Sequence, residues 1–342
     1  MAGPHLALKI GFAALPGTPE KHVSVDGMTR RGPNLSHWPG NRTPAAFKAD
    51  LSTGICLAFA RASTAEQRAF LDGAETIVND HYDTDGFLSM LALARPEVAL
   101  ARAEVCLTAA ATGDYQSFHD QHGFAVDRIV LNLPRSPDSP IADRLTGKTD
   151  AERALCCYQW LIDNAERVLD DPWSLAPLFE AELASVLEQL ARTRIDAVRD
   201  LHADCGLAVV RTPAPIHRIV LNTVAGAFRV LHCIESERGL LVRYHDRTES
   251  WFELATFEPP ARRDLRPLAA QLRDLDADGN GRWCADPPDQ PVPELYHGIP
   301  EPQEYGQITR TLTATAVGAD AIERAVAGFF RELPWTGLDH RD

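Results

Sequence analysis

Apolar residues in the first 205 positions form short β-branched runs and helical repeats. In the clearest case, the run Thr76–Asn79 is followed by the polar turn Asp80–Gly86 and then by an apolar helix predicted over 87–94. Strand, polar turn and helix in this order are typical of a parallel α/β sheet. We therefore expect an α/β fold with a mostly parallel sheet and flanking helices in the N-terminal part.

Further helices are predicted from apolar positions at helical spacing and from polar caps. Ser63 and Thr64 are expected to begin one helix, because Glu66 and Gln67 follow in its first turn. Another is expected to end near Gly113, since glycine suits a C-terminal cap. The helices predicted in this way cover residues 45–62, with an interruption around 52–54, and residues 64–73, 96–112, 150–169 and 175–204.

The pattern changes to that of strands after Gly206. Segments rich in β-branched residues alternate with turns such as Pro213-Ala214-Pro215, which predicts an antiparallel sheet. Amphipathic helices are expected over 264–274 and 319–333. The expected strands cover residues 207–211, 217–224, 228–234, 240–244, 251–254 and 307–317.

The chain length favours two domains, because 342 residues exceed the size of a typical single domain. A Pro- and Ser-rich stretch at 134–140 and the change of pattern near residue 206 indicate the boundaries. We expect an α/β domain over 1–145, a helical connector over 146–205, and an α+β substrate or cap domain with an antiparallel sheet over 206–342.

Composition narrows the possible partners and location. The formal net charge is −14 and the basic residues are scattered, which argues against binding to extended nucleic acid or to a membrane surface. No run approaches the roughly 20 apolar residues that span a bilayer, and the N-terminus does not resemble a secretory signal. The seven cysteines are an odd number spread over a long chain, with no Cys-x-x-Cys pair, which predicts buried apolar residues in a reducing compartment. We expect a cytoplasmic protein that binds a small molecule.

The turn after the predicted strand 76–79 carries residues suited to metal chemistry. Asp83 and Asp85 stand at the carboxyl end of that strand, where open α/β folds bind their ligands. Their carboxylates favour Mg²⁺ or Mn²⁺, and the imidazole of His81 shifts the preference toward Mn²⁺. A plainer alternative is that both aspartates only form the turn and cap the next helix.

The same segment resembles a known motif. The strand followed by Asp83-Thr84-Asp85-Gly86 and Ser89 resembles the first motif of the DHH phosphoesterase superfamily, Asp-x-Asp-Gly-x-x-Ser. In that family the aspartates bind catalytic Mn²⁺ or Mg²⁺, and a catalytic α/β lobe faces a smaller substrate lobe. The resemblance covers residues 76–89 and implies the same metal chemistry here.

The resemblance also implies further ligands. Members of the family carry another aspartate after a later strand and then an Asp-His-His triplet. The nearest candidates in this chain are Asp114 and the loop His119-Asp120-Gln121-His122, and no Asp-His-His occurs. Asp114 and His119 are therefore expected as additional metal ligands.

A second group of polar side chains occurs upstream, between Ser36 and Pro44. Prolines at 39 and 44 constrain this loop, and a constrained loop can direct its side chains at a ligand. His37 suits a metal ligand or general acid, and Arg42 suits a phosphate clamp. The alternative is an exposed loop in which Trp38 fills a gap.

An acidic run over 274–283 resembles the first half of a calcium-binding loop. Asp276, Asp278 and Asn280 stand at alternate positions, but position twelve holds Pro287 in place of glutamate. An acidic turn is the favoured interpretation.

These features predict a Mn²⁺- or Mg²⁺-dependent hydrolase of phosphoester or phosphoanhydride bonds in a small or short oligomeric substrate. The alternative is a non-catalytic ligand-binding or scaffold protein with a degenerate metal site, which the missing Asp-His-His favours. The expected metal ligands are Asp83, Asp85, His81, Asp114 and His119, and the groups expected to act on the substrate are His37, Arg42 and His81.

Overall fold

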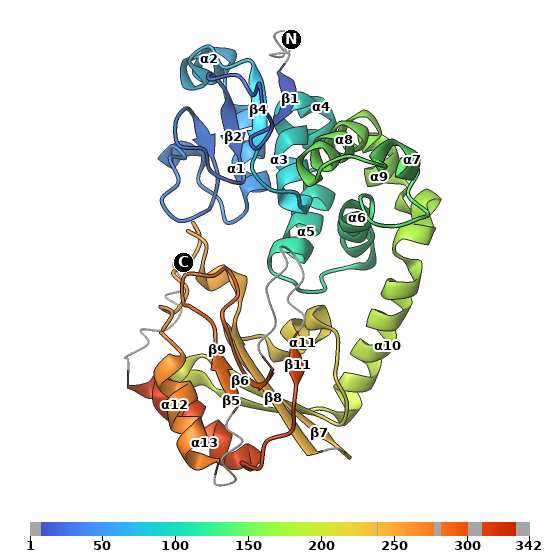
Figure 1. Ribbon diagram of the computed structural model, residues 1–342. Coiled ribbons are helices and arrows are strands. Elements are labelled where there is room, and N and C mark those ends of the chain that lie inside the picture. The colour runs from blue at the N-terminus through green and yellow to red at the C-terminus, as the bar shows by residue number, and fades with distance from the viewer. Residues whose placement is uncertain (1–7, 238, 277–281, 300–309, 333–342) are drawn as a thin grey trace. The chain divides into compact units, whose positions relative to one another are not determined.

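The computed structural model describes residues 8–237, 239–276, 282–299 and 310–332 (Figure 1). The chain divides into two compact units. The first comprises Met1–Ser185 with Phe252–Thr256, and the second comprises Val186–Trp251 with Phe257–Asp342. The division falls inside helix α10 (Glu180–Asp196), so the expected connector over 146–205 is shared between the two units.

Parallel strands form the sheet of the first unit. Among the described residues this sheet has four strands in the order β1-β4-β2-β3, and every pair is parallel. The predicted parallel α/β architecture is confirmed, as is the strand at 76–79. Because parallel strands end at the same edge, the segments that follow β2, β3 and β4 lie together. The strands are β1 (Lys9–Phe12), β2 (Val23–Val25), β3 (Asn34–Leu35) and β4 (Thr76–Asn79).

Helices pack on this sheet and on one another (Figure 1). None of the helices in the described ranges is long and apolar enough to cross a membrane. The helices of the first unit are α1 (Ser52–Arg61), α2 (Thr64–Leu71), α3 (Thr84–Ala94), α4 (Pro96–Ala101), α5 (Ala103–Asp114), α6 (Gln121–Asn132), α7 (Ala142–Leu145), α8 (Asp150–Asp163) and α9 (Ala165–Asp170), with 3₁₀ turns η1 (Ala45–Phe47) and η2 (Pro172–Leu178).

Helix α3 is the central helix of the first core. Its residues Phe87 and Leu88 are fully buried, as are Ile77 and Val78 of β4. The helix begins three residues before the predicted start, because the side chain of Asp83 caps its first turn. The strand and the helix thereby fix the turn that joins them.

Three long predicted helices are interrupted. The helix predicted over 150–169 is broken at Asn164, which separates α8 from α9. The helix predicted over 96–112 is broken at Arg102, whose backbone leaves the helical region and whose guanidinium donates to Asp170 at 2.6 Å and 2.7 Å. The helix predicted over 175–204 ends at Asp196, and a strand follows it. The ion pair of Arg102 and the pairing of β5 with β6 after Asp196 are tertiary contacts that override the local preference for helix.

A mixed sheet forms the centre of the second unit. Within the described residues it has seven strands in the order β11-β10-β8-β7-β6-β5, with β9 also paired to β10. All pairs are antiparallel except β6 with β7. The predicted α+β region is confirmed, with one parallel pair inside its sheet. The strands are β5 (Val198–His202), β6 (Leu207–Thr212), β7 (Arg229–Ser236), β8 (Gly239–Asp246), β9 (Trp283–Ala285), β10 (Glu294–Ile299) and β11 (Thr311–Leu312).

The prediction of a strand over 217–224 is wrong, because this segment forms helix α11 (Arg218–Ala225). It connects β6 to β7, and a parallel pair of strands requires a crossover, which is usually helical. The His217 side chain accepts a hydrogen bond from the Ile219 amide and caps the helix, and Gly226 ends it in the left-handed region. The strand predicted over 251–254 does not form, and a 3₁₀ turn, η4 (Thr248–Ser250), precedes that segment.

The two faces of the second sheet differ. One face packs against α12 (Arg266–Leu275) and α13 (Ala319–Arg331) in a large apolar core that includes Leu231 and Tyr244. The other face carries α11 and a small apolar cluster around Val210 and Val230. Residues 277–281 of the acidic run and residues 307–309 of the last predicted strand lie outside the described residues.

Candidate metal centre

Three strand ends of the first sheet supply charged residues to one place. Asp26 follows β2, His37 lies two residues after β3, and Asp80 follows β4. Asp83 and Asp85 lie at the start of α3, just beyond Asp80. The parallel order of these strands brings the five residues to the same edge of the sheet.

Among the described residues, two groups of side chains can each hold a metal ion, and both include Asp26. One consists of Asp26, His81 and Asp83, and the other of Asp26, His37 and Asp85. His81 Nε2 lies 3.0 Å from Asp26 Oδ2, whereas His37 Nε2 lies 3.7 Å from Asp26 Oδ1. The two oxygens of Asp26 therefore face different groups, so each group would have one Asp26 oxygen available to a cation.

Both imidazoles are oriented by a partner at Nδ1. His37 Nδ1 lies 2.7 Å from the carbonyl oxygen of Asp50, and His81 Nδ1 lies 2.8 Å from Asp80 Oδ1. In each ring the other nitrogen, Nε2, faces the carboxylates. Metal-binding histidines almost always have such an acceptor on the nitrogen that does not bind the metal.

The two aspartates of the turn are held by backbone amides. Asp85 is fully buried and accepts from the amides of Ser52 at 2.8 Å and Thr53 at 2.7 Å, at the N-terminus of α1. Asp83 accepts from the Gly86 amide through Oδ1, and its Oδ2 lies 2.9 Å from His81 Nε2. Asp83 thus caps α3 with one oxygen, as the plainer interpretation predicted, and its other oxygen faces His81.

The concentration of carboxylates alters their protonation. Burial, with Asp83 and Asp85 nearby, raises the pKa of Asp26 to about 8. Burial, together with Asp85 and Asp26, raises the pKa of Asp114 well above its ordinary value. Burial alone would lower the pKa of His81, but the carboxylates of Asp83 and Asp26 raise it well above its usual range. A divalent cation would balance the same negative charge.

The surroundings of His37 Nε2 test whether a cation fits between this atom and the carboxylates. This atom is buried and has no hydrogen-bond partner, yet oxygens of Asp114, Asp26 and Asp85 lie 3.4, 3.7 and 3.8 Å away. None of these contacts has the geometry of a hydrogen bond. The distances suit ligands that each lie about 2.0–2.2 Å from a shared ion. Imidazole nitrogen with carboxylate oxygen is a suitable donor set for a divalent cation.

Most of the residues predicted from the sequence meet at this centre. His37, His81, Asp83 and Asp85 belong to the two groups, and Asp114 lies against His37. Arg42 does not join them. Its guanidinium donates to the carbonyl oxygens of Thr29 at 2.9 Å and Gly32 at 3.2 Å, so it ties its own loop together.

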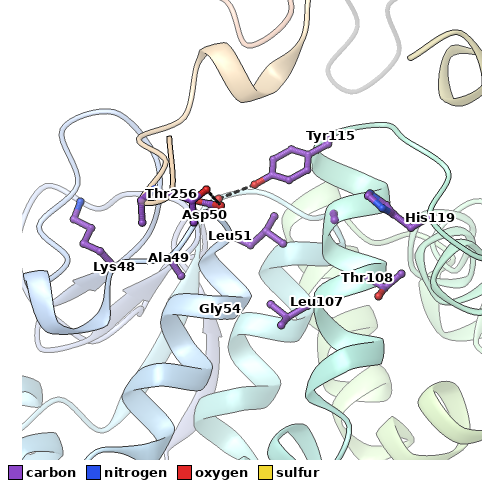
Figure 2. Close-up of a pocket in the computed structure, with 12 residues that line it drawn as sticks. Lys48, Ala49, Asp50, Leu51, Gly54, Leu107, Thr108, Tyr115, His119 and Thr256 are labelled. Atoms are coloured by element: carbon purple, nitrogen blue, oxygen red, sulfur yellow. Dashed lines mark hydrogen bonds between the residues drawn. The ribbon is translucent and has the colours of Figure 1, made fainter. Parts of the chain in front are cut away.

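His119 lies elsewhere in the first unit. It lines a pocket of about 520 Å³ together with Lys48, Tyr115 and Thr256 (Figure 2), and it belongs to neither ligand group. The rest of its loop has structural contacts. Asp120 caps α6, and His122 Nε2 lies 2.7 Å from the carbonyl oxygen of Leu169.

The pocket adjoins the candidate metal centre through Asp50, which lines the pocket (Figure 2). The carbonyl oxygen of Asp50 accepts from the Tyr115 hydroxyl at 2.9 Å and lies 2.7 Å from His37 Nδ1. Tyr115 directly follows Asp114 in the chain. The wall of the pocket is therefore bonded to one candidate ligand and continuous with another.

A segment from much later in the sequence covers His37. The ring of Phe252 stacks on the imidazole with centroids 3.8 Å apart, and the Glu253 amide donates to the carbonyl oxygen of His37 at 2.8 Å. The Glu253 carboxylate accepts from the amide of Gly40 and the side chain of Asn41, each at 2.7 Å. These contacts keep His37 away from solvent.

Sequence reasoning missed Asp26 and the orienting role of Asp80. Asp26 follows the run Val23-Ser24-Val25, which lies in a Gly- and Pro-rich region interpreted as short strands and loops. The available signal was a β-branched run followed directly by an aspartate. The run before Asp26 has this form, and so does the run before Asp80. The pairing of the two strands, which brings the aspartates together, is visible only in the structure.

Comparison with known proteins gives the family but no activity. The chain matches no curated protein and no solved structure. One family model matches residues 9–338, which is nearly the whole chain. The chain therefore belongs to DUF6687, a family of unknown function.

Proposed function

We propose that this protein is a Mn²⁺- or Mg²⁺-dependent hydrolase of phosphoester or phosphoanhydride bonds in a small or short oligomeric substrate. The observation that carries the proposal is the position of Asp26 between two groups, each with one histidine and one further aspartate. Two-metal sites of this kind are common in enzymes that cleave phosphoesters.

Some residues of the centre would bind the cations, and others orient the residues that bind them. His37, His81 and three aspartates provide nitrogen and oxygen ligands, while Asp80 and the Asp50 carbonyl set the orientation of the imidazoles. A bound divalent cation would polarise a phosphoryl oxygen and lower the pKa of a water molecule. Phe252 excludes water from one side of His37, which strengthens electrostatic interactions there.

The resemblance to DHH phosphoesterases supports the same function. Asp83 and Asp85 match the first motif, and both contribute to the candidate centre. The chain has no Asp-His-His, but His37 and His81 bring two imidazoles to the carboxylates from separate loops. The missing triplet is therefore compatible with a metal centre.

The proposal also includes a small substrate and a cytoplasmic location for the protein. The pocket of about 520 Å³ beside the centre suits a small substrate. A cytoplasmic location is supported by the seven cysteines, all of which are free.

Metal binding is the first test. Wild type and Asp26→Asn would be compared by elemental analysis and Mn²⁺ calorimetry, followed by hydrolysis of p-nitrophenyl phosphate and its diester. Asparagine has the size of aspartate and adds no buried charge, so the variant should fold. Changes to residues outside the ligand shell typically lower metal affinity by roughly 10–100-fold. We expect Asp26→Asn to lower the Mn²⁺ affinity by more than this, and to abolish hydrolysis.

Asp138→Asn is the matched control, since Asp138 lies exposed in a loop. It should keep both metal and activity. Equal Mn²⁺ affinity in wild type and Asp26→Asn would contradict the metal centre. Tight metal binding with no hydrolysis of any phosphoester would favour a non-catalytic ligand-binding or scaffold protein.

A further inference from the structure

The α11-covered face of the second sheet carries a cluster of basic side chains. His232 on β7 is the register partner of Arg243 on β8, and His245 lies two residues further along β8, on the same face. Arg218, the first residue of α11, pairs with Glu294 of β10, which is the register partner of His245. Side chains at such neighbouring positions on one face lie close enough to contact one ligand.

Positive charge on this face exceeds negative charge. Among the described residues, Arg218 pairs with Glu294 and Arg310 pairs with Asp286 at 2.6 Å, whereas no carboxylate lies within ion-pair distance of Arg243. Arg243 Nε and Arg218 Nη1 are buried and have no hydrogen-bond partner. A buried guanidinium nitrogen without a partner is costly unless a ligand satisfies it.

The two histidines each lack a partner at one nitrogen. Thr212 Oγ1 donates its proton to the Ala214 carbonyl, so it accepts from His232 Nε2 at 2.8 Å. Asn222 Oδ1 likewise accepts from His245 Nε2 at 2.8 Å. In both neutral rings Nδ1 is therefore a hydrogen-bond acceptor, and both Nδ1 atoms are buried without a partner.

The surroundings keep both rings neutral. Burial, together with Arg243 and Arg218, lowers the pKa of His232 well below its ordinary value, and burial with Arg218, Arg243 and Arg247 does the same for His245. Burial and Arg218 lower the pKa of Arg243 to about 10, and the Glu294 carboxylate opposes this shift only in part. The cluster thus offers guanidinium donors beside two imidazole acceptors.

We propose that Arg218, Arg243, His232 and His245 form a binding site for a compact oxyanion that carries a proton, with the chemistry of hydrogenphosphate. The charged oxygens of such an anion accept from the guanidinium groups, which favour phosphate geometry. Its P–OH group donates to an imidazole Nδ1. Sulfate has the same shape but no proton at neutral pH, so it leaves the imidazoles unsatisfied.

The site lies wholly within the second unit and does not depend on the proposed metal chemistry. Free phosphate and a phosphoryl group on a larger molecule share the relevant chemistry. Both would place charged oxygens against Arg243.

The experiment is calorimetry of the full chain at neutral pH with EDTA present, so that no metal-bound phosphate contributes. Inorganic phosphate and sulfate are titrated separately. We expect phosphate to bind at least about tenfold more tightly than sulfate, and to raise Tm. Competition by phenyl phosphate would assign the site to phosphoryl groups on larger molecules, and exclusion of phenyl phosphate would assign it to the free anion. Both results support the site.

Substitutions in the cluster test whether phosphate binds there. Arg243→Gln should weaken phosphate binding at least about tenfold, remove the phosphate-dependent rise in Tm, and leave Tm in phosphate-free buffer equal to or above that of wild type. Arg243→Lys keeps the charge but not the forked geometry and should bind with intermediate affinity. His232→Leu should reduce the preference for phosphate over sulfate.

Arg266→Gln is the control, because Arg266 is exposed and paired with Asp264. It should bind phosphate like wild type. The proposal is wrong if wild type binds neither anion, if Arg243→Gln binds phosphate as tightly as wild type, or if sulfate binds as tightly as phosphate.

Discussion

The carboxylate of Asp80 joins the two strand ends that carry the candidate metal ligands. Its Oδ1 lies 2.8 Å from His81 Nδ1, and its Oδ2 accepts from the Met28 amide at 3.1 Å, two residues after Asp26. Asp80 belongs to neither ligand group. Its role is to keep His81 Nε2 directed at Asp26 and Asp83.

We therefore expect Asp80→Ala to weaken Mn²⁺ binding by about 10–100-fold while the fold is retained, because the imidazole loses its orienting partner. Calorimetry with Mn²⁺ and circular dichroism would measure the two effects. Asp138→Ala, in an exposed loop, provides the control. Unchanged affinity in Asp80→Ala would show that the ring is positioned by other contacts.

At the scale of elements, the first turn of α3 determines how closely the candidate metal ligands approach β4. Gly86 lies in that turn, and a Cβ there would lie 2.2 Å from Asn79 Nδ2 and 2.6 Å from the Tyr158 hydroxyl. Tyr158 in turn donates to the carbonyl oxygen of His81 at 2.9 Å. Glycine is required here for close approach.

Gly86→Ala should consequently destabilise the protein by about 1–3 kcal/mol, as overpacked cores do, and should also weaken metal binding. Gly328→Ala is a matched control, since nothing lies within 4 Å of a Cβ added at this exposed position in α13. That control should stabilise the protein by up to about 1 kcal/mol. Urea unfolding of both variants would test the contrast, and equal stabilities would refute it.

At the scale of the whole molecule, the buried histidines of the second unit link stability to pH. His232 and His245 have pKa values well below 6.5 in the folded state, because of burial and neighbouring arginines. Unfolded histidine binds its proton near pH 6.5. Below that pH the unfolded state holds more protons than the folded state, so the free energy of unfolding falls as pH falls.

In phosphate-free buffer we expect each histidine to lower the free energy of unfolding by about 1.4 kcal/mol per pH unit below pH 6.5, until its folded-state pKa is reached. Hydrogen exchange of the β7 and β8 amides would report this loss locally. His232→Gln should show a shallower dependence. An identical pH dependence in wild type and this variant would exclude the histidine as its source.

Local sequence patterns were sufficient to predict a helix or strand where the residues of that element determine its structure. The β-branched run of β4 and the apolar repeat of α3 predicted both elements, and the polar turn between them directed attention to His81, Asp83 and Asp85. The same reasoning failed for α11. Its apolar and β-branched residues suit either a helix or a strand, and the parallel pairing of β6 with β7 decided between them.

The sequence by itself determined the α/β class and the change to an α+β region, and it predicted the acidic turn as the place for metal chemistry. Only the tertiary structure brought Asp26 and His37 to that turn, excluded Arg42 and His119, and gathered Arg218, His232 and Arg243 on one sheet face. The reason is physical. Periodicity and caps depend on residues a few positions apart, whereas a site depends on strand order and register, which bring together residues that are distant in the chain.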